Sequence, residues 1–157
     1  MRLEYFQLLD RIVDLKLADR KISSEATVPE TSTIFEGHFP GYPLMPGVLL
    51  IEAMAQTSGW LLIALNRFER MPFLAAVKDA KLRNFVKPAE RLTIDAHLVH
   101  EGSGYAMTEA AVKCGGKSVC DASLTFRVVE FPSADMAKQM RDIAASIGLP
   151  VGAPANG

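Results

Sequence analysis

A long apolar run from Val48 to Leu65 limits the folds open to this chain, because it contains a single charged residue, Glu52. Its length approaches the ~20 residues that a membrane-spanning helix needs. Glu52 and Gln56 stand one helical turn apart near its middle, however, and the carboxylate alone would cost about 2.5 kcal/mol or more in lipid. We therefore predict no membrane span here, but a helix buried inside a soluble protein.

The composition agrees with one soluble domain. The chain has 157 residues, of which 49% are hydrophobic and 22% charged, and its formal net charge is -1. This length can bury a substantial core without disulfides, and the charge balance disfavours a strongly basic nucleic-acid-binding protein. Charged residues interrupt the apolar residues of segment 1–15, so we expect no export signal and a cytoplasmic location.

The two cysteines flank a predicted hairpin turn at residues 115–116, which are both glycine. In the simplest register Cys114 lies opposite Lys117, and Cys120 lies opposite Ala111. The two thiols then do not face one another, and a disulfide needs close and correctly directed Cβ atoms. We therefore predict that both thiols are reduced.

The hydrophobic pattern predicts an antiparallel sheet around one central helix. Helices are expected near residues 4–9, from Pro46 to about Arg67, and after an N-cap at Ser133; strands are expected at 11–17, 21–28, 73–86, 91–101, 105–114 and 117–129. In the strand 91–101, apolar residues alternate with polar ones, so one face of the sheet must be covered. The apolar helix is the element available to cover it, which predicts an α+β fold of the hot-dog type.

Three segments follow from this pattern. We expect a hot-dog domain at 1–131, a helical extension at 132–148, and a flexible tail rich in proline and glycine at 149–157. The extension is predicted to be an amphipathic surface helix, because apolar residues recur in it at helical spacing.

The loop before the apolar helix holds the residues best suited to chemistry. Three prolines in this loop restrict the ways in which His38 can be presented. A histidine titrates near neutral pH and can act as a base. The free amides at the start of the following helix, including that of Gly47, can polarise a carbonyl oxygen.

Glu52 lies among apolar neighbours, and burial favours a protonated carboxyl that can donate its proton. Gln56, at position i+4, can hydrogen-bond this carboxyl and hold its orientation. A base, an acid and an amide donor are the parts needed to remove a proton α to a thioester carbonyl and to expel a β-hydroxyl as water.

The residues alone leave other interpretations open. Glu52 could be satisfied by a backbone group or at a subunit interface, and a lone loop histidine such as His38 is often structural. His97 falls on the polar face of its strand and His100 near the end of that strand, so we expect neither to be catalytic.

Segment His38–Gln56, HFPGYPLMPGVLLIEAMAQ, resembles the active-site signature of bacterial 3-hydroxyacyl-acyl carrier protein dehydratases of the FabZ type. This resemblance implies His38 as the catalytic base, Glu52 as the acid that assists departure of the hydroxyl, Gly47 as the amide donor to the thioester oxygen, and Gln56 as the support for Glu52. It also implies a homodimer in which each site takes its histidine from one subunit and its acid from the other, with three dimers forming a hexamer.

The departures from the family pattern concern specificity. Glu52 stands where relatives of the FabA type carry Asp, which implies dehydration without isomerisation. The His-Arg-Tyr-Pro motif usual near the amino terminus is missing, and the helical extension lies beyond the minimal domain. Phe73 lies near the family's tunnel-gating aromatic position, although a core aromatic is an equal alternative. The acyl chain length is therefore open, and a dedicated pathway for unusually long chains is one candidate.

A basic segment follows the apolar helix. Five basic residues lie there against two acidic ones, and they are Lys78, Lys81, Arg83, Lys87 and Arg91. With the family resemblance they indicate docking of an acidic carrier protein, while a solvated strand face is the competing interpretation.

We therefore predict reversible dehydration of a 3-hydroxyacyl thioester on acyl carrier protein, with no metal and no organic cofactor. Two alternatives use the same fold: a hot-dog thioesterase in which Glu52 activates water, and a non-catalytic acyl-binding subunit.

Overall fold

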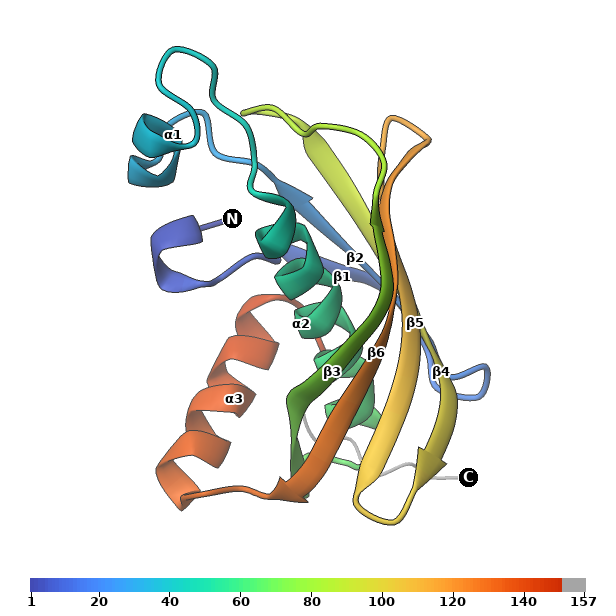
Figure 1. The fold of residues 1–157 in the computed structure, drawn as a ribbon. Coiled ribbons are helices and arrows are strands. Elements are labelled where there is room, and N and C mark those ends of the chain that lie inside the picture. Colours follow the sequence, from blue (N-terminus) through green and yellow to red (C-terminus); the bar gives the residue numbers. More distant parts are fainter. Residues whose placement is uncertain (151–157) are drawn as a thin grey trace.

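The computed structural model describes residues 1–150, which form one antiparallel sheet curved around a helix (Figure 1). The elements are η1 (Leu3–Tyr5), β1 (Arg11–Lys16), β2 (Lys21–Thr27), α1 (Thr33–Gly37), α2 (Gly47–Leu65), β3 (Arg70–Leu82), β4 (Arg91–Gly102), β5 (Tyr105–Cys114), β6 (Lys117–Glu130) and α3 (Ala134–Ser146). The strand order β1-β2-β4-β5-β6-β3 leaves β1 and β3 at the two edges of the sheet.

Helix α2 is the centre of the core, as the sequence predicts. Ala53, Met54 and Leu61 are fully buried in it and face the apolar side of the sheet. The helix is long and apolar enough to cross a membrane, but its place inside the curved sheet makes it a core helix. Pro46 is its N-cap rather than its first residue, because the backbone there is extended, with ψ at 132°.

Buried hydroxyls fix α2 against the sheet. The hydroxyls of Ser24 and Thr57 are 2.7 Å apart, and Thr108 donates to the hydroxyl of Ser58 at 2.8 Å. All four residues are inaccessible to solvent. A buried hydroxyl is costly without a partner, so these pairs favour one position of the helix on the strands.

Strand β3 starts and ends earlier than the predicted strand 73–86. Pro72 was expected to precede the strand, but it lies inside it, opposite Val128 of β6. An edge strand accepts proline because its outward N–H has no partner within the sheet. At the other end, the amide of Arg83 still donates to the carbonyl of Val119, although β3 ends at Leu82.

The hairpin between β5 and β6 is present, with both glycines of the turn at positive φ. Cys114 lies opposite Lys117 as predicted, but a register shift after Val112 places Cys120 opposite Val112 and not Ala111. A bulge of this kind inserts a residue without a sequence signal. The prediction of two free thiols is confirmed.

Two short elements near the amino terminus differ from prediction. The helix expected at 4–9 is a single 3-10 turn, η1, while α1 was not predicted. Ser32 caps α1 by accepting from the amide of Ile34 at 3.1 Å, and the Glu4 carboxylate accepts from the amide of Thr33 at 3.0 Å. Five residues are too few for a helical pattern, so the N-cap serine was the only available signal.

The carboxy-terminal helix α3 is confirmed, with Ser133 accepting from the amide of Met136 as its N-cap. It lies beside α2 on the side away from the sheet (Figure 1). The predicted flexible tail is wrong at its first residue, because Leu149 is buried and its amide donates to the carbonyl of Ala144 at 2.9 Å. Residues 151–157 of that tail lie outside the described residues.

Candidate active site

The loop between α1 and α2 holds the imidazole of His38 in one orientation. Its Nδ1 is 2.9 Å from the carbonyl oxygen of Leu44, and the amide of Leu44 donates to the carbonyl of His38 at 2.9 Å. A carbonyl oxygen only accepts, so Nδ1 carries the hydrogen and the neutral ring keeps Nε2 free to accept a proton. The ring stacks on that of Phe39, with the two centroids 4.1 Å apart.

Gly47 is the first residue of α2, where backbone amides have no acceptor within the helix. These amides lie at the positive end of the helix dipole and can stabilise negative charge on an oxygen atom. A Cβ at Gly47 would meet only the end of the Leu82 side chain on β3, which is exposed and can move aside.

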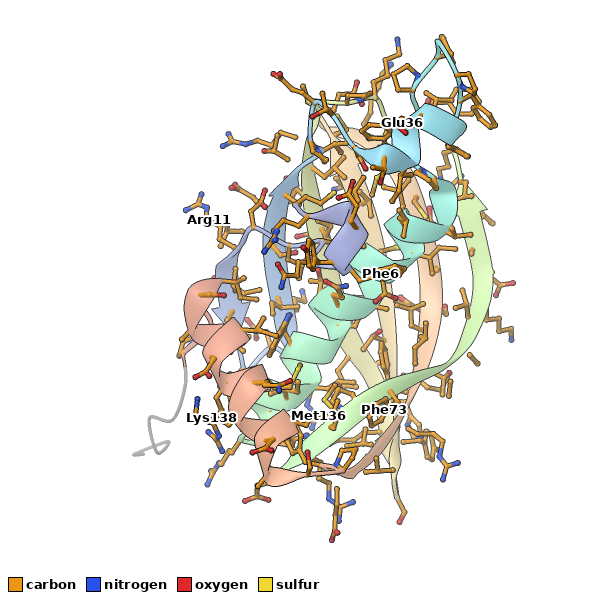
Figure 2. All side chains as sticks on the ribbon, turned by 90° about the vertical axis from the view of Figure 1, so that its left-hand side faces the viewer. Phe6, Arg11, Glu36, Phe73, Met136 and Lys138 are labelled. Carbon is orange, nitrogen blue, oxygen red and sulfur yellow. The ribbon has the colours of Figure 1, made fainter. Side chains whose placement is uncertain are left out.

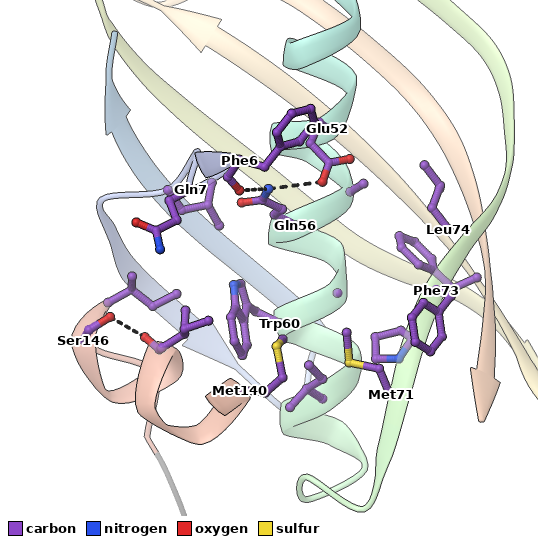
Figure 3. A pocket seen from close by; sticks show the side chains of 18 of the residues that line it. Phe6, Gln7, Glu52, Gln56, Trp60, Met71, Phe73, Leu74, Met140 and Ser146 are labelled. Carbon is purple, nitrogen blue, oxygen red and sulfur yellow. Dashed lines mark hydrogen bonds between the residues drawn. The ribbon is translucent and has the colours of Figure 1, made fainter. Parts of the chain in front are cut away.

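Gln56 holds the carboxyl of Glu52, as the i+4 spacing predicts (Figure 3). Its Nε2 donates to Glu52 Oε1 at 3.1 Å and to the carbonyl of Phe6 at 2.7 Å. Its Oε1 accepts from the amide of Leu8 at 3.2 Å. Both the nitrogen and the oxygen of the Gln56 amide are thus hydrogen-bonded, and the side chain joins the acid on α2 to the segment after η1.

Glu52 and Gln56 lie at one end of a groove of about 550 Å³, a volume within the range of small-molecule sites. Most of its other walls are apolar, and they include Trp60, Ile63, Met71, Phe73, Leu74, Met140 and Ile143 (Figure 3). Phe73 therefore lines the same space as the candidate acid. A carboxyl at the end of an apolar slot suits a substrate with a polar head and a hydrocarbon chain.

His38 does not line this groove within a single chain. The structure therefore brings Glu52, Gln56 and Phe73 together, and it places His38 and Gly47 at the entry to α2. Within residues 1–150, no hydrogen bond joins His38 or Gly47 to Glu52, Gln56 or Phe73.

The basic segment is dispersed. Lys78 and Lys81 are exposed on β3, whereas the guanidinium of Arg83 contacts the carboxylate of Asp121 at 2.7 Å, which raises the pKa of Arg83. Lys87 contacts Glu90 through its backbone amide, which donates to the Glu90 carboxylate, and its ammonium group takes no part in this hydrogen bond.

The other two histidines have surface partners. His97 lies 3.4 Å from Glu109, and His100 lies 3.1 Å from the hydroxyl of Tyr105. Neither lines the groove. Within residues 1–150, His, Cys, Asp and Glu side chains form no group of three or more suited to a metal ion.

Sequence reasoning missed two parts of the groove. The backbone of Phe6 and Leu8 holds Gln56 from 48 to 50 positions away along the chain, and Met140 of α3 forms part of the wall. The only sequence signal was the apolar face of α3, which did not indicate what that face contacts.

Comparison with known proteins gives both a family and a fold. A family described as FabA-like domain matches residues 2–123. A 3-hydroxyacyl-[acyl-carrier-protein] dehydratase FabZ from Ligilactobacillus salivarius is 34% identical over 122 residues, covering 77% of this chain and 86% of that protein. The bifunctional enzyme LpxC/FabZ from Chlorobaculum tepidum is 40% identical over 127 residues, covering 80% of this chain and 27% of that enzyme.

Among solved structures, a hypothetical thioesterase with coenzyme A from Streptococcus pneumoniae superposes with a TM-score of 0.62. The sequences are 19% identical, and the match covers 78% of this chain and 88% of that one. This likeness confirms the predicted hot-dog fold and concerns the fold alone.

Proposed function

The chain belongs to the FabA-like domain family, and from this premise we propose that it dehydrates a 3-hydroxyacyl thioester on acyl carrier protein to the trans-2-enoyl thioester. The strongest support comes from Glu52, whose carboxyl is held by Gln56 at the polar end of an otherwise largely apolar groove. The curated FabZ relatives, at comparable length, carry the name of this reaction.

In this reaction His38 Nε2 removes a proton from C2 of the substrate. The amide of Gly47 donates to the thioester oxygen and stabilises the negative charge that develops there. Glu52 protonates the C3 hydroxyl, the C3–O bond breaks, and water leaves as the C2–C3 double bond forms. The proton on His38 then returns to Glu52 through solvent, which restores both groups for the next turnover.

The site is completed by a second copy of the chain. Strand β3 is a 13-residue edge strand, and it leaves 41–55% of the surface of Leu74, Val77 and Leu82 exposed. A long edge with exposed apolar side chains is a template for strand pairing. Pairing of two β3 strands about a two-fold axis supplies each Glu52 with the His38 of the other subunit, which accounts for the separation of these residues within one chain.

The carrier protein docks on the basic residues near β3. Lys78 and Lys81 carry most of this role, together with Lys87, because Arg83 is already paired with Asp121. Reversing the charge of Lys78 and Lys81 is expected to raise KM for the carrier-bound substrate while KM for a small pantetheine thioester stays the same.

Conversion of a 3-hydroxyacyl carrier substrate by the purified protein tests the proposal. We expect the enoyl thioester to accumulate with the wild type, and His38→Ala and Glu52→Gln each to lower kcat about 100-fold or more. An unchanged substrate, beside a control dehydratase that converts it, would refute dehydration. Release of free thiol from an acyl thioester without a 3-hydroxyl would instead indicate a thioesterase.

We also propose where the protein is located and how it assembles. The protein is a cytoplasmic homodimer, and three dimers associate as a hexamer. Mixing inactive His38→Ala with inactive Glu52→Gln protein tests the shared site, because subunit exchange restores one intact site per mixed dimer. Light scattering of the same samples measures the oligomer, and activity that stays absent in proven mixed dimers contradicts the shared site.

A further inference from the structure

Helix α3 forms one side of the groove that holds Glu52. Met140 and Ile143 of α3 and its C-cap residue Ile147 lie at helical spacing and line this groove, which passes between α3 and α2 (Figure 3). The family match ends at residue 123, so α3 lies outside the matched residues.

The helix is anchored near its carboxy-terminal end. Ala144 and Ile147 are buried, and the carbonyl of Ile147 accepts from the amide of Ile12 at 2.7 Å. Arg141 adds a contact on the flank of the helix, with its guanidinium 4.9 Å from the centre of the Phe68 ring. These contacts hold α3 in place beside α2.

The inner face of α3 is left incompletely covered. Met140 is half-buried and packs against the core, whereas Ile143 keeps 37% of its surface exposed, and both line the groove. A helix that served only to cover the core would bury Ile143 completely as well. The exposed parts of these two side chains leave apolar surface available to a hydrocarbon ligand.

The opposite wall is a continuous stripe of α2. Glu52, Gln56, Trp60 and Ile63 recur at helical spacing along this wall, and Gly59 beside them adds no side chain. Eleven residue steps separate Glu52 from Ile63, which is buried at the far end of the stripe, and they span about 16 Å at ~1.5 Å per residue. An extended chain advances about 1.25 Å per C–C bond, so this stripe matches about 13 carbons beyond the one that carries the hydroxyl.

We propose that α3 is the outer wall of an acyl-chain site and that Met140 sets the length of the 3-hydroxyacyl chain, which the groove accepts up to about 16 carbons. This inference rests on the proposed function, since Glu52 marks the position of the reacting carbon. Met140 is a specificity-determining residue, and it takes no part in the chemical step.

Two variants change the groove in opposite directions, and a third residue on the same helix provides the control. Met140→Trp fills the groove and Met140→Ala widens it. Met136→Trp and Met136→Ala make the same changes one turn earlier, at a residue of α3 that does not line the groove (Figure 2). Circular dichroism and the melting temperature establish that each variant is folded.

The measurements are kcat/KM over a ladder of 3-hydroxyacyl pantetheine thioesters and Kd for unreactive acyl-pantetheine amides of the same lengths. For the wild type we expect Kd to fall up to about fourfold per added methylene until the groove is full. Met140→Trp should weaken binding and lower kcat/KM at least tenfold for chains of 14–16 carbons and less than twofold for four carbons. Met140→Ala should extend the preference to longer chains, and the Met136 variants should match the wild type.

The two readouts separate the proposals. If the wild type turns over substrate and kcat/KM depends on chain length in the same way in the Met140 and Met136 variants, the role of α3 is overturned and the dehydratase proposal stands. In a second outcome, the wild type turns over no substrate, but Kd for the acyl-pantetheine amides depends on chain length and changes only in the Met140 variants. This result supports the acyl-chain site and overturns the dehydratase. Amide binding that does not depend on chain length overturns the acyl site.

Discussion

Replacing Gln56 with leucine removes the side chain that joins the candidate acid to the amino-terminal segment at little change in volume. Three hydrogen bonds are lost, to Glu52, to the carbonyl of Phe6 and to the amide of Leu8. At a net value of about 1 kcal/mol each, with a further penalty where a buried group is left unpaired, the free energy of unfolding should fall by about 2–4 kcal/mol. For a chain of this size the melting temperature should drop by roughly 5–15 °C.

Catalysis should suffer through Glu52. General acid catalysis contributes about 10²- to 10⁴-fold, and a carboxyl free to rotate loses part of this. We expect Gln56→Leu to lower kcat about 10- to 100-fold with a smaller change in KM, measured by steady-state dehydration at fixed protein concentration. Gln139→Leu, the same change at an exposed position of α3, should leave kcat unchanged.

A double-mutant cycle distinguishes positioning of Glu52 from general damage. If Gln56 acts through Glu52, its loss should cost little further kcat in a Glu52→Gln background, while the loss of stability through Phe6 and Leu8 should persist. An equal fold-loss in both backgrounds, or a kcat for Gln56→Leu within twofold of the wild type, would refute this reasoning.

Three further predictions concern stability, reactivity and packing. Hydrogen bonds from Ser32 and from backbone amides lower the pKa of Glu4 from 4.5 to about 2, so its stabilising effect is complete above pH 4.5 and is lost as the pH falls towards 2. The free energy of unfolding, measured with denaturant from pH 5 to 2.5, should therefore depend less on pH in Glu4→Gln than in the wild type. Parallel curves for the two proteins would contradict this. Burial, and to a smaller extent the charge of Asp121, raises the pKa of Cys120 to about 11. A thiol reagent at pH 8 should therefore modify the wild type and Cys120→Ser at similar slow rates until denaturant is added. Fast labelling of the native wild type that disappears in Cys120→Ser would be the opposite result. In Gly47→Ala the new methyl group would meet only the end of the Leu82 side chain, which is 55% exposed and can turn away, so kcat/KM should fall less than about threefold. A loss of tenfold or more that Leu82→Ala relieves would count against this reasoning.

Features with a local cause could be predicted from the sequence. The apolar run with Glu52 and Gln56 determined a core helix, since no other element could bury so much apolar surface. The i+4 spacing determined their hydrogen bond, and glycines at positive φ determined the turn after Cys114. Each of these follows from residues close together along the chain, where helical or turn geometry alone sets the distances.

Features that depend on distant segments needed the tertiary structure. Pro72 belongs to a strand because β3 lies at an edge of the sheet, and the residues of one strand do not specify its place in the strand order. The bulge after Val112 arises from the pairing of β5 with β6. Gln56 binds Phe6 and Leu8 because folding brings η1 beside α2, and no periodicity in either segment encodes that contact.

The carboxy-terminal helix shows the same division. Its N-cap at Ser133 and its apolar spacing determined a helix with one apolar face, since both depend on neighbours within a few residues. The position of that face opposite Trp60, with Met140 partly buried against the core and lining the groove, was decided by where the end of α3 is anchored. Amphipathic spacing specifies that a face must be covered, and only the packed chain specifies what covers it.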